Sequence, residues 1–142
     1  MSQINSTEKV QTGSRFLIAD DNMVNRTLLN HLLKPYGECI CAVDGLEAVD
    51  QFKRSTTDRP FDLIFMDVMM PEFDGFAALG AIRDFESEKN TAPSKVVMVS
   101  ALKGQDQVER SKEFGALQYL HKPLRESDIF DLLSELGISK RD

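Results

Sequence analysis

The chain has 142 residues, 42% of them hydrophobic, so it can bury one core but is too short for two ordinary domains. Its 17 Lys and Arg against 23 Asp and Glu give a formal charge of −6, and without a basic run this argues against nucleic acid or a membrane surface as a direct partner. No stretch approaches the roughly 18 apolar residues of a membrane span, and the polar start lacks a signal-peptide core, so we expect a cytoplasmic protein.

Short apolar runs alternate with segments of helical periodicity along the chain. After a polar, flexible tail over 1–14, the run RFLIAD predicts a strand, and the apolar spacing after it predicts a helix closed by Pro35 and Gly37. The same alternation continues until a short tail over 138–142. The expected strands are 15–20, 38–43, 61–66, 95–100 and 116–121, and the expected helices are 22–37, 45–54, 74–86, 104–114 and 126–136.

This alternation predicts an α/β fold with a doubly wound parallel sheet. Each helix must carry the chain back across the sheet, and the nearly continuous apolar strands are typical of strands covered on both faces. In such folds the binding site lies outside the carboxyl ends of the strands. The residues that end strands are therefore the candidate functional residues.

Charged and hydroxyl side chains stand at these strand ends. Asp20 and Asp21 follow the first strand, Asp67 the third, Ser100 the fourth and Lys122 the fifth. Carboxylates crowded into one cleft raise one another's pKa unless a cation offsets their charge. Mg²⁺ suits this role, because it prefers oxygen ligands and keeps water positions open for a phosphate.

The same set of side chains indicates phosphoryl transfer to a carboxylate. A carboxylate can attack phosphorus and form an aspartyl phosphate. Asp67 is the best nucleophile because it is central and single, whereas Asp20 and Asp21 are better placed as metal ligands. Lys122 would neutralise charge on the transferred group, and Ser100 could donate a hydrogen bond to it.

Four motifs resemble the receiver domain of two-component response regulators. They are IADDN after the first strand, MDVMMPEFDG after the third, VSA after the fourth and HKP after the fifth. The resemblance covers residues 15–137 and implies a flavodoxin-like (βα)5 fold with strand order 2-1-3-4-5. It also implies that Asp67 is the phosphoacceptor, and that Asp20, Asp21, Asp67 and the main-chain carbonyl of Met69 hold Mg²⁺.

The resemblance further implies a conformational switch. Ser100 would be the switch hydroxyl, and Tyr119 matches an aromatic residue that turns inward when this hydroxyl moves toward the phosphoryl group. The responding surface would be the helix at 104–114, the strand at 116–121 and the last helix. Lys122–Pro123 matches a peptide bond that is cis in many receivers, which the small X-Pro penalty permits.

The segment DDNMVNR resembles most closely the receivers of hybrid histidine kinases. The implied phosphoryl donor is a histidine on a kinase, and the implied acceptor is a histidine phosphotransfer domain. The chain would be no enzyme beyond catalysing its own phosphorylation and dephosphorylation. A stand-alone chemotaxis-type regulator stays open as an alternative, as does a phosphorylation-dependent dimer.

Other classes with a similar fold fit the sequence less well. A haloacid-dehalogenase-like phosphatase needs a second acid two residues after its nucleophile, where this chain has Met69. A flavodoxin needs a phosphate loop rich in Ser, Thr and Gly after the first strand, where this chain has ADDNMVN. A docking module that works without phosphorylation would lack one of the five strand-end residues, and none is missing.

The sequence departs from the receiver-family pattern at Ser100, Met69 and Leu102. The family often has Thr where this chain has Ser100. The apolar Met69 and Leu102 stand at positions whose side chains influence the attacking water in this family, which predicts slow autodephosphorylation.

Cys39 and Cys41 lie two positions apart in an expected strand. Their Cα atoms would be about 6.6 Å apart, at the limit of what a disulfide can span. We expect buried free thiols there and no metal site.

Overall fold

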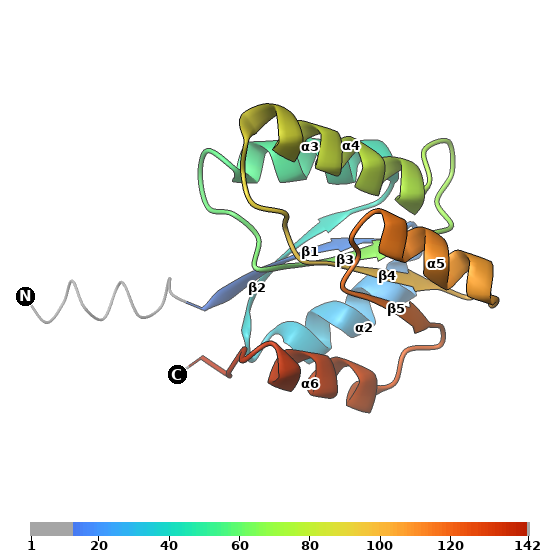
Figure 1. Ribbon diagram of the computed structural model, residues 1–142. Coiled ribbons are helices and arrows are strands. Elements are labelled where there is room, and N and C mark those ends of the chain that lie inside the picture. The colour runs from blue at the N-terminus through green and yellow to red at the C-terminus, as the bar shows by residue number, and fades with distance from the viewer. Residues whose placement is uncertain (1–12, 142) are drawn as a thin grey trace, which may run out of the picture.

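The computed structural model describes residues 13–141 (Figure 1). Most of the predicted tail over 1–14 and the last residue of the tail over 138–142 lie outside this range. Within it, strands and helices alternate as the sequence predicts. The strands are β1 (Ser14–Ala19), β2 (Gly37–Ala42), β3 (Leu63–Asp67), β4 (Val96–Ser100) and β5 (Gln118–His121), and the helices are α2 (Met23–Leu33), α3 (Gly45–Ser55), α4 (Gly75–Lys89), α5 (Gln105–Glu113) and α6 (Glu126–Glu135).

The strands form one parallel sheet in the order β2-β1-β3-β4-β5. The predicted doubly wound α/β class and the strand order 2-1-3-4-5 are therefore confirmed. In this order β1 and β3 are neighbours, and so are β3 and β4. The carboxyl ends of these central strands consequently meet at one edge of the sheet.

Helices cover both faces of the sheet (Figure 1). Alternate residues of β1 enter different cores, since successive side chains of a strand point to opposite faces: Phe16 joins Leu29 and Leu133 of α2 and α6, whereas Leu17 joins Leu79 of α4. These side chains are all buried. One apolar core therefore covers each face of the sheet, and α5 contacts the edge strand β5.

Several element boundaries differ from the prediction by a few residues. The helix predicted over 22–37 ends at Leu33: Lys34 is its C-cap and still donates to the Asn30 carbonyl, but Pro35 has no amide hydrogen with which to continue the helix. The helix predicted over 74–86 continues to Lys89 and ends at Asn90, which has a left-handed φ of 56°. Asp67 is the last residue of β3 and not the residue after it.

The carboxyl-terminal segment contacts the body of the domain. Ile138 packs against the core of α2 and α6, and the Arg141 amide donates a hydrogen bond of 2.9 Å to the Pro35 carbonyl. The division into a tail over 1–14, a domain over 15–137 and a tail over 138–142 stays a prediction.

Three smaller expectations can be compared with the structure. Cys39 and Cys41 are free thiols, but they are half-buried on edge strand β2 and not fully buried. The Lys122–Pro123 bond is cis, as predicted. Among residues 13–141, no helix combines the length and the apolar character that crossing a bilayer requires.

We predict that Gly75→Ala destabilises the fold by about 1–3 kcal/mol, as overpacking typically does. Gly75 begins α4 against β3, and a Cβ atom there would lie 2.1 Å from the Asp67 carbonyl oxygen. Urea unfolding would measure the change. The matched control is Gly80→Ala in the same helix, where the new Cβ would lie 3.4 Å from the Phe114 ring and helix propensity should stabilise by up to roughly 1 kcal/mol. Equal effects at the two positions would contradict this packing argument.

Candidate functional site

Asp67 lies at the centre of the carboxyl edge of the sheet. It ends β3, and its side chain is only 3% exposed. Its Oδ1 accepts a hydrogen bond of 3.3 Å from the Met69 amide, and its Oδ2 lies 3.1 Å from Nζ of Lys122. The turn after β3 therefore holds the carboxylate in place while the chain leaves toward α4.

Asp20 is a second buried carboxylate, in the turn between β1 and α2. Its Oδ1 accepts a hydrogen bond of 2.8 Å from the Asn22 amide, and Nη1 of Arg26 donates to its main-chain carbonyl at 2.9 Å. The side chain of Asn22 accepts a hydrogen bond from the Asn25 amide and caps α2. The helix cap is thus Asn22, which leaves the carboxylates of Asp20 and Asp21 free of that role.

Lys122 bridges the two buried carboxylates. Its Nζ lies 3.0 Å from Oδ2 of Asp20 and 3.1 Å from Oδ2 of Asp67. Burial lowers the pKa of this ammonium, but the hydrogen bonds and charges of the two aspartates outweigh burial, so the pKa of Lys122 is raised overall. Lys122 is therefore positively charged at neutral pH and fixed between its partners.

One ammonium does not fully offset the carboxylates. Burial, followed by the negative charge of Asp20, raises the pKa of Asp67 to about 6, although Lys122 and the Met69 amide act in the opposite direction. Ionised Asp67 is therefore held in a site that disfavours its charge. A cation or a partner with complementary charge would relieve this cost.

The chemistry of the donors fits a divalent cation. Asp20, Asp21 and Asp67 each offer one carboxylate oxygen, and these three oxygens lie within 4.8 Å of one another. Asp21 is exposed whereas the other two are buried, so the cluster opens to solvent on one side. Hard oxygen donors at this spacing suit Mg²⁺. The main-chain carbonyl of Met69 stays a predicted ligand.

Ser100 and Tyr119 meet through the main chain of Leu102. The buried Oγ of Ser100 accepts a hydrogen bond of 3.0 Å from the Leu102 amide. The hydroxyl of Tyr119 donates a hydrogen bond of 2.9 Å to the Leu102 carbonyl. The two residues predicted to form the switch are therefore connected through one residue of the loop that leads into α5.

The structure brings all five strand-end residues to one edge of the sheet, but three further residues shape the site. Arg26 and Asn22 fix the turn that carries Asp20, and Gly75 lets α4 start against Asp67. The position of Asn22 before a helical pattern signals a cap. Arg26 has no such signal, because its contact depends on the path of the turn.

The chain belongs to the response regulator receiver domain family, which it matches over residues 16–134. Receiver domains are signalling modules of two-component and phosphorelay systems. The hybrid signal transduction histidine kinase B of Dictyostelium discoideum is 35% identical over 132 residues, which cover 87% of this chain and 6% of that protein. The chemotaxis protein CheY of Treponema pallidum is 32% identical, over 86% of this chain and 81% of CheY. The chain thus spans only a small part of the hybrid kinase.

Solved receiver domains have the same fold. The receiver domain of Ssk1 from Saccharomyces cerevisiae, in complex with the histidine phosphotransfer protein Ypd1, gives a TM-score of 0.79 at 28% identity over 88% of this chain and 89% of that one. The receiver domain of the Arabidopsis thaliana histidine kinase CKI1, complexed with Mg²⁺, gives a TM-score of 0.76 at 29% identity over 87% and 91%. The predicted flavodoxin-like receiver fold is confirmed.

We predict that Asp67→Asn stabilises the protein at neutral pH when divalent cations are chelated. Since the folded state holds the Asp67 proton more tightly than the unfolded chain does, ionisation costs folding free energy above a pH of about 6. The variant avoids this cost, so its unfolding free energy should exceed the wild-type value by on the order of 1–3 kcal/mol.

Urea unfolding at a series of pH values would measure this difference in unfolding free energy. It should shrink as the pH falls below about 6 and disappear below 3.8, the ordinary pKa of an aspartate. Asp21→Asn is the matched control, because it removes a charge that water already solvates. A less stable Asp67→Asn protein at neutral pH would contradict the predicted strain at Asp67.

Proposed function

We propose that this domain accepts a phosphoryl group from a phosphohistidine onto Asp67 and uses it as a signal. The observation that carries the proposal is the placement of Asp67, which is buried, hydrogen-bonded to Lys122 and within 4.8 Å of the oxygens of Asp20 and Asp21. An aspartate with a purely structural role would be more stable without two further carboxylates beside it. Membership of the receiver family supports the same role.

In the proposed reaction, an oxygen of Asp67 attacks phosphorus and the P–N bond of the phosphohistidine breaks. The electron pair of that bond stays on the imidazole nitrogen, and the product is an aspartyl phosphate. Lys122 is within hydrogen-bond reach of Asp67 and would pair with an oxygen of the transferred group. Ser100 would donate its hydroxyl proton to another oxygen of that group.

Mg²⁺ is the proposed cofactor. Asp20, Asp21 and Asp67 would hold it together with the Met69 carbonyl, and it would supply positive charge against the incoming phosphoryl oxygens. The solved receiver of CKI1 complexed with Mg²⁺ supports this assignment. Without a cation, three carboxylates face a single Lys122, and they would repel a phosphodonor.

The proposed output surface consists of α5, β5 and α6. Movement of Ser100 toward a phosphoryl group would disturb its hydrogen bond with the Leu102 amide, and the Leu102 carbonyl in turn holds Tyr119. α5 can respond easily, because Ser111 is the only buried residue along its length. We therefore propose Ser100 and Tyr119 as the switch pair, and the same surface could support a phosphorylation-dependent dimer.

The proposed partners are a histidine kinase and a histidine phosphotransfer protein. The matches with a hybrid histidine kinase and with a receiver bound to the phosphotransfer protein Ypd1 support this setting, and a cytoplasmic location would suit it. The match with CheY, most of whose length the chain covers, favours a stand-alone regulator as the second candidate. Phosphotransfer profiling against purified kinases and phosphotransfer proteins would distinguish the two.

We expect acetyl phosphate to add one phosphoryl group to the wild-type protein in Mg²⁺, but not in a chelator. Asp67→Asn should abolish this mass increase, because an amide is a poor nucleophile. Intact-mass spectrometry or 31P NMR would measure it. Asp74→Asn is the control, since Asp74 caps α4 outside the cluster and Asn caps equally well. Labelling that survives in Asp67→Asn would overturn the assignment, and a failure to label wild type would favour a docking module.

We expect the phosphorylated domain to lose its phosphoryl group over minutes or longer. Met69 and Leu102 present apolar side chains, 58% and 37% exposed, and neither can hold an attacking water by a hydrogen bond. The decay can be followed by mass after the phosphodonor is removed. Met69→Asn should accelerate it, whereas Met23→Asn, at an exposed position on α2, should not. Decay of the wild-type phosphoprotein within seconds in Mg²⁺ would contradict this prediction.

A further inference from the structure

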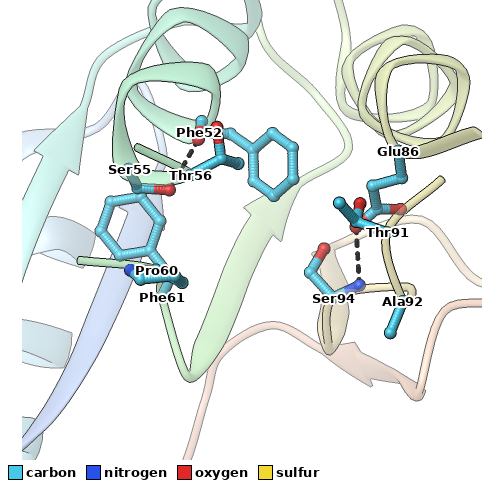
Figure 2. Close-up of a pocket in the computed structure, with 9 residues that line it drawn as sticks. All are labelled: Phe52, Ser55, Thr56, Pro60, Phe61, Glu86, Thr91, Ala92 and Ser94. Carbon is cyan, nitrogen blue, oxygen red and sulfur yellow. Dashed lines mark hydrogen bonds between the residues drawn. The ribbon is translucent and has the colours of Figure 1, made fainter. Parts of the chain in front are cut away.

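A cavity of about 280 Å³ lies at the edge of the sheet opposite Asp67. Figure 2 shows Phe52, Ser55 and Thr56 on one side of it, facing Glu86 and Thr91 across the opening. Its remaining lining residues are Pro60, Phe61, Ala92 and Ser94. Because Phe61 and Ser94 precede β3 and β4 whereas Asp67 and Ser100 end these strands, the cavity is separate from the phosphoacceptor site.

The two buried polar side chains in the wall of this cavity, Ser55 and Glu86, are already paired with the protein. The Ser55 hydroxyl donates a hydrogen bond of 2.6 Å to the Phe52 carbonyl. The buried Glu86 carboxylate accepts hydrogen bonds of 2.6 Å from the Ser94 amide and 2.8 Å from Nη1 of Arg83. The cavity therefore offers its occupant chiefly the rings of Phe52 and Phe61, which are the surroundings that an apolar group prefers.

A second, more open hollow of about 550 Å³ adjoins the cavity and is cationic. The two share Thr56 and Thr91 as lining residues. Lys53, Arg54 and Lys89 also line the second hollow, which lies where α3 and α4 end. This is a concentration of positive charge on a chain whose formal net charge is −6.

Two of these cations converge on one aromatic ring. Nζ of Lys53 lies 5.4 Å and Nζ of Lys89 5.7 Å from the centroid of Phe85. Arg54 forms an ion pair with Asp50, but Lys53 and Lys89 form none with any described residue. Both lysines line the same hollow, so an anion bound there would be stabilised by two positive charges that no described carboxylate already pairs.

We infer that the joined hollows bind a small carboxylate with an aromatic body, its ring in the cavity of Phe52 and Phe61 and its carboxylate beside Lys53 and Lys89. The size of the cavity limits the apolar part to roughly one ring, since it lies at the low end of ligand pocket volumes. A short chain of methylene groups would pass between Thr56 and Thr91 to the lysines. Asp67 lines neither hollow, so binding there would not require its phosphorylation.

The test is a titration of the 15N-labelled protein with 4-phenylbutyrate, followed by amide chemical shifts. We expect saturable shifts at Thr56, Thr91 and Ser94, and no comparable shifts at Ser100 or Lys122. Two control ligands should bind at least about fivefold more weakly than 4-phenylbutyrate. Acetate has the carboxylate but no ring to fill the cavity, and 4-phenylbutylamine has the ring but a positive charge that the lysines would repel.

The double variant Lys53→Gln with Lys89→Gln should bind 4-phenylbutyrate about fivefold or more weakly than the wild-type protein does. Both side chains are exposed, so the spectrum without ligand should show an intact fold. The matched control is Lys34→Gln, at the exposed end of α2 on the other face of the sheet, and it should leave binding unchanged. Equal binding by the double variant, equal binding of the amine, or shifts confined to other parts of the domain would each overturn the inference.

Discussion

The site depends on one ammonium group that is shared by two buried carboxylates. Nζ of Lys122 lies 3.0 Å from Asp20 and 3.1 Å from Asp67, and these three side chains come from the ends of three different strands. With Asp21 included, three negative charges face one positive charge. Burial and, after it, the charge of Asp20 keep the pKa of Asp67 high. The excess of negative charge makes the site receptive to a cation, while Lys122 keeps the carboxylates from moving apart.

Rigid and loosely held elements meet at this edge of the sheet. β3 is buried along its whole length and α4 begins in contact with its last residue, so Asp67 can move little. In contrast, α5 buries a single residue, Ser111. Leu102 connects the rigid strand ends with the segment around α5, because its main chain is hydrogen-bonded to both Ser100 and Tyr119. In the proposed switch, a change at the rigid site would pass through Leu102 to α5.

Much of this arrangement can be predicted from local patterns. Strands buried on both faces read as continuous apolar runs such as FDLIFM, and helices show their period, so the α/β class follows from the sequence. A parallel sheet gathers its carboxyl ends at one edge, which places Asp20, Asp67, Ser100 and Lys122 together. The strand order came from the motif resemblance, since periodicity does not say which strands are neighbours.

By itself, then, the sequence determined the class of fold and the residues that stand at the strand ends. Only the tertiary structure decided how these residues pair, because Lys122 is more than 50 positions from Asp67 and about 100 from Asp20 along the chain. The raised pKa of Asp67, the contact of Arg26 with Asp20 and the close approach of Gly75 to β3 have the same origin. They depend on burial and on distances across the fold, which no local pattern encodes.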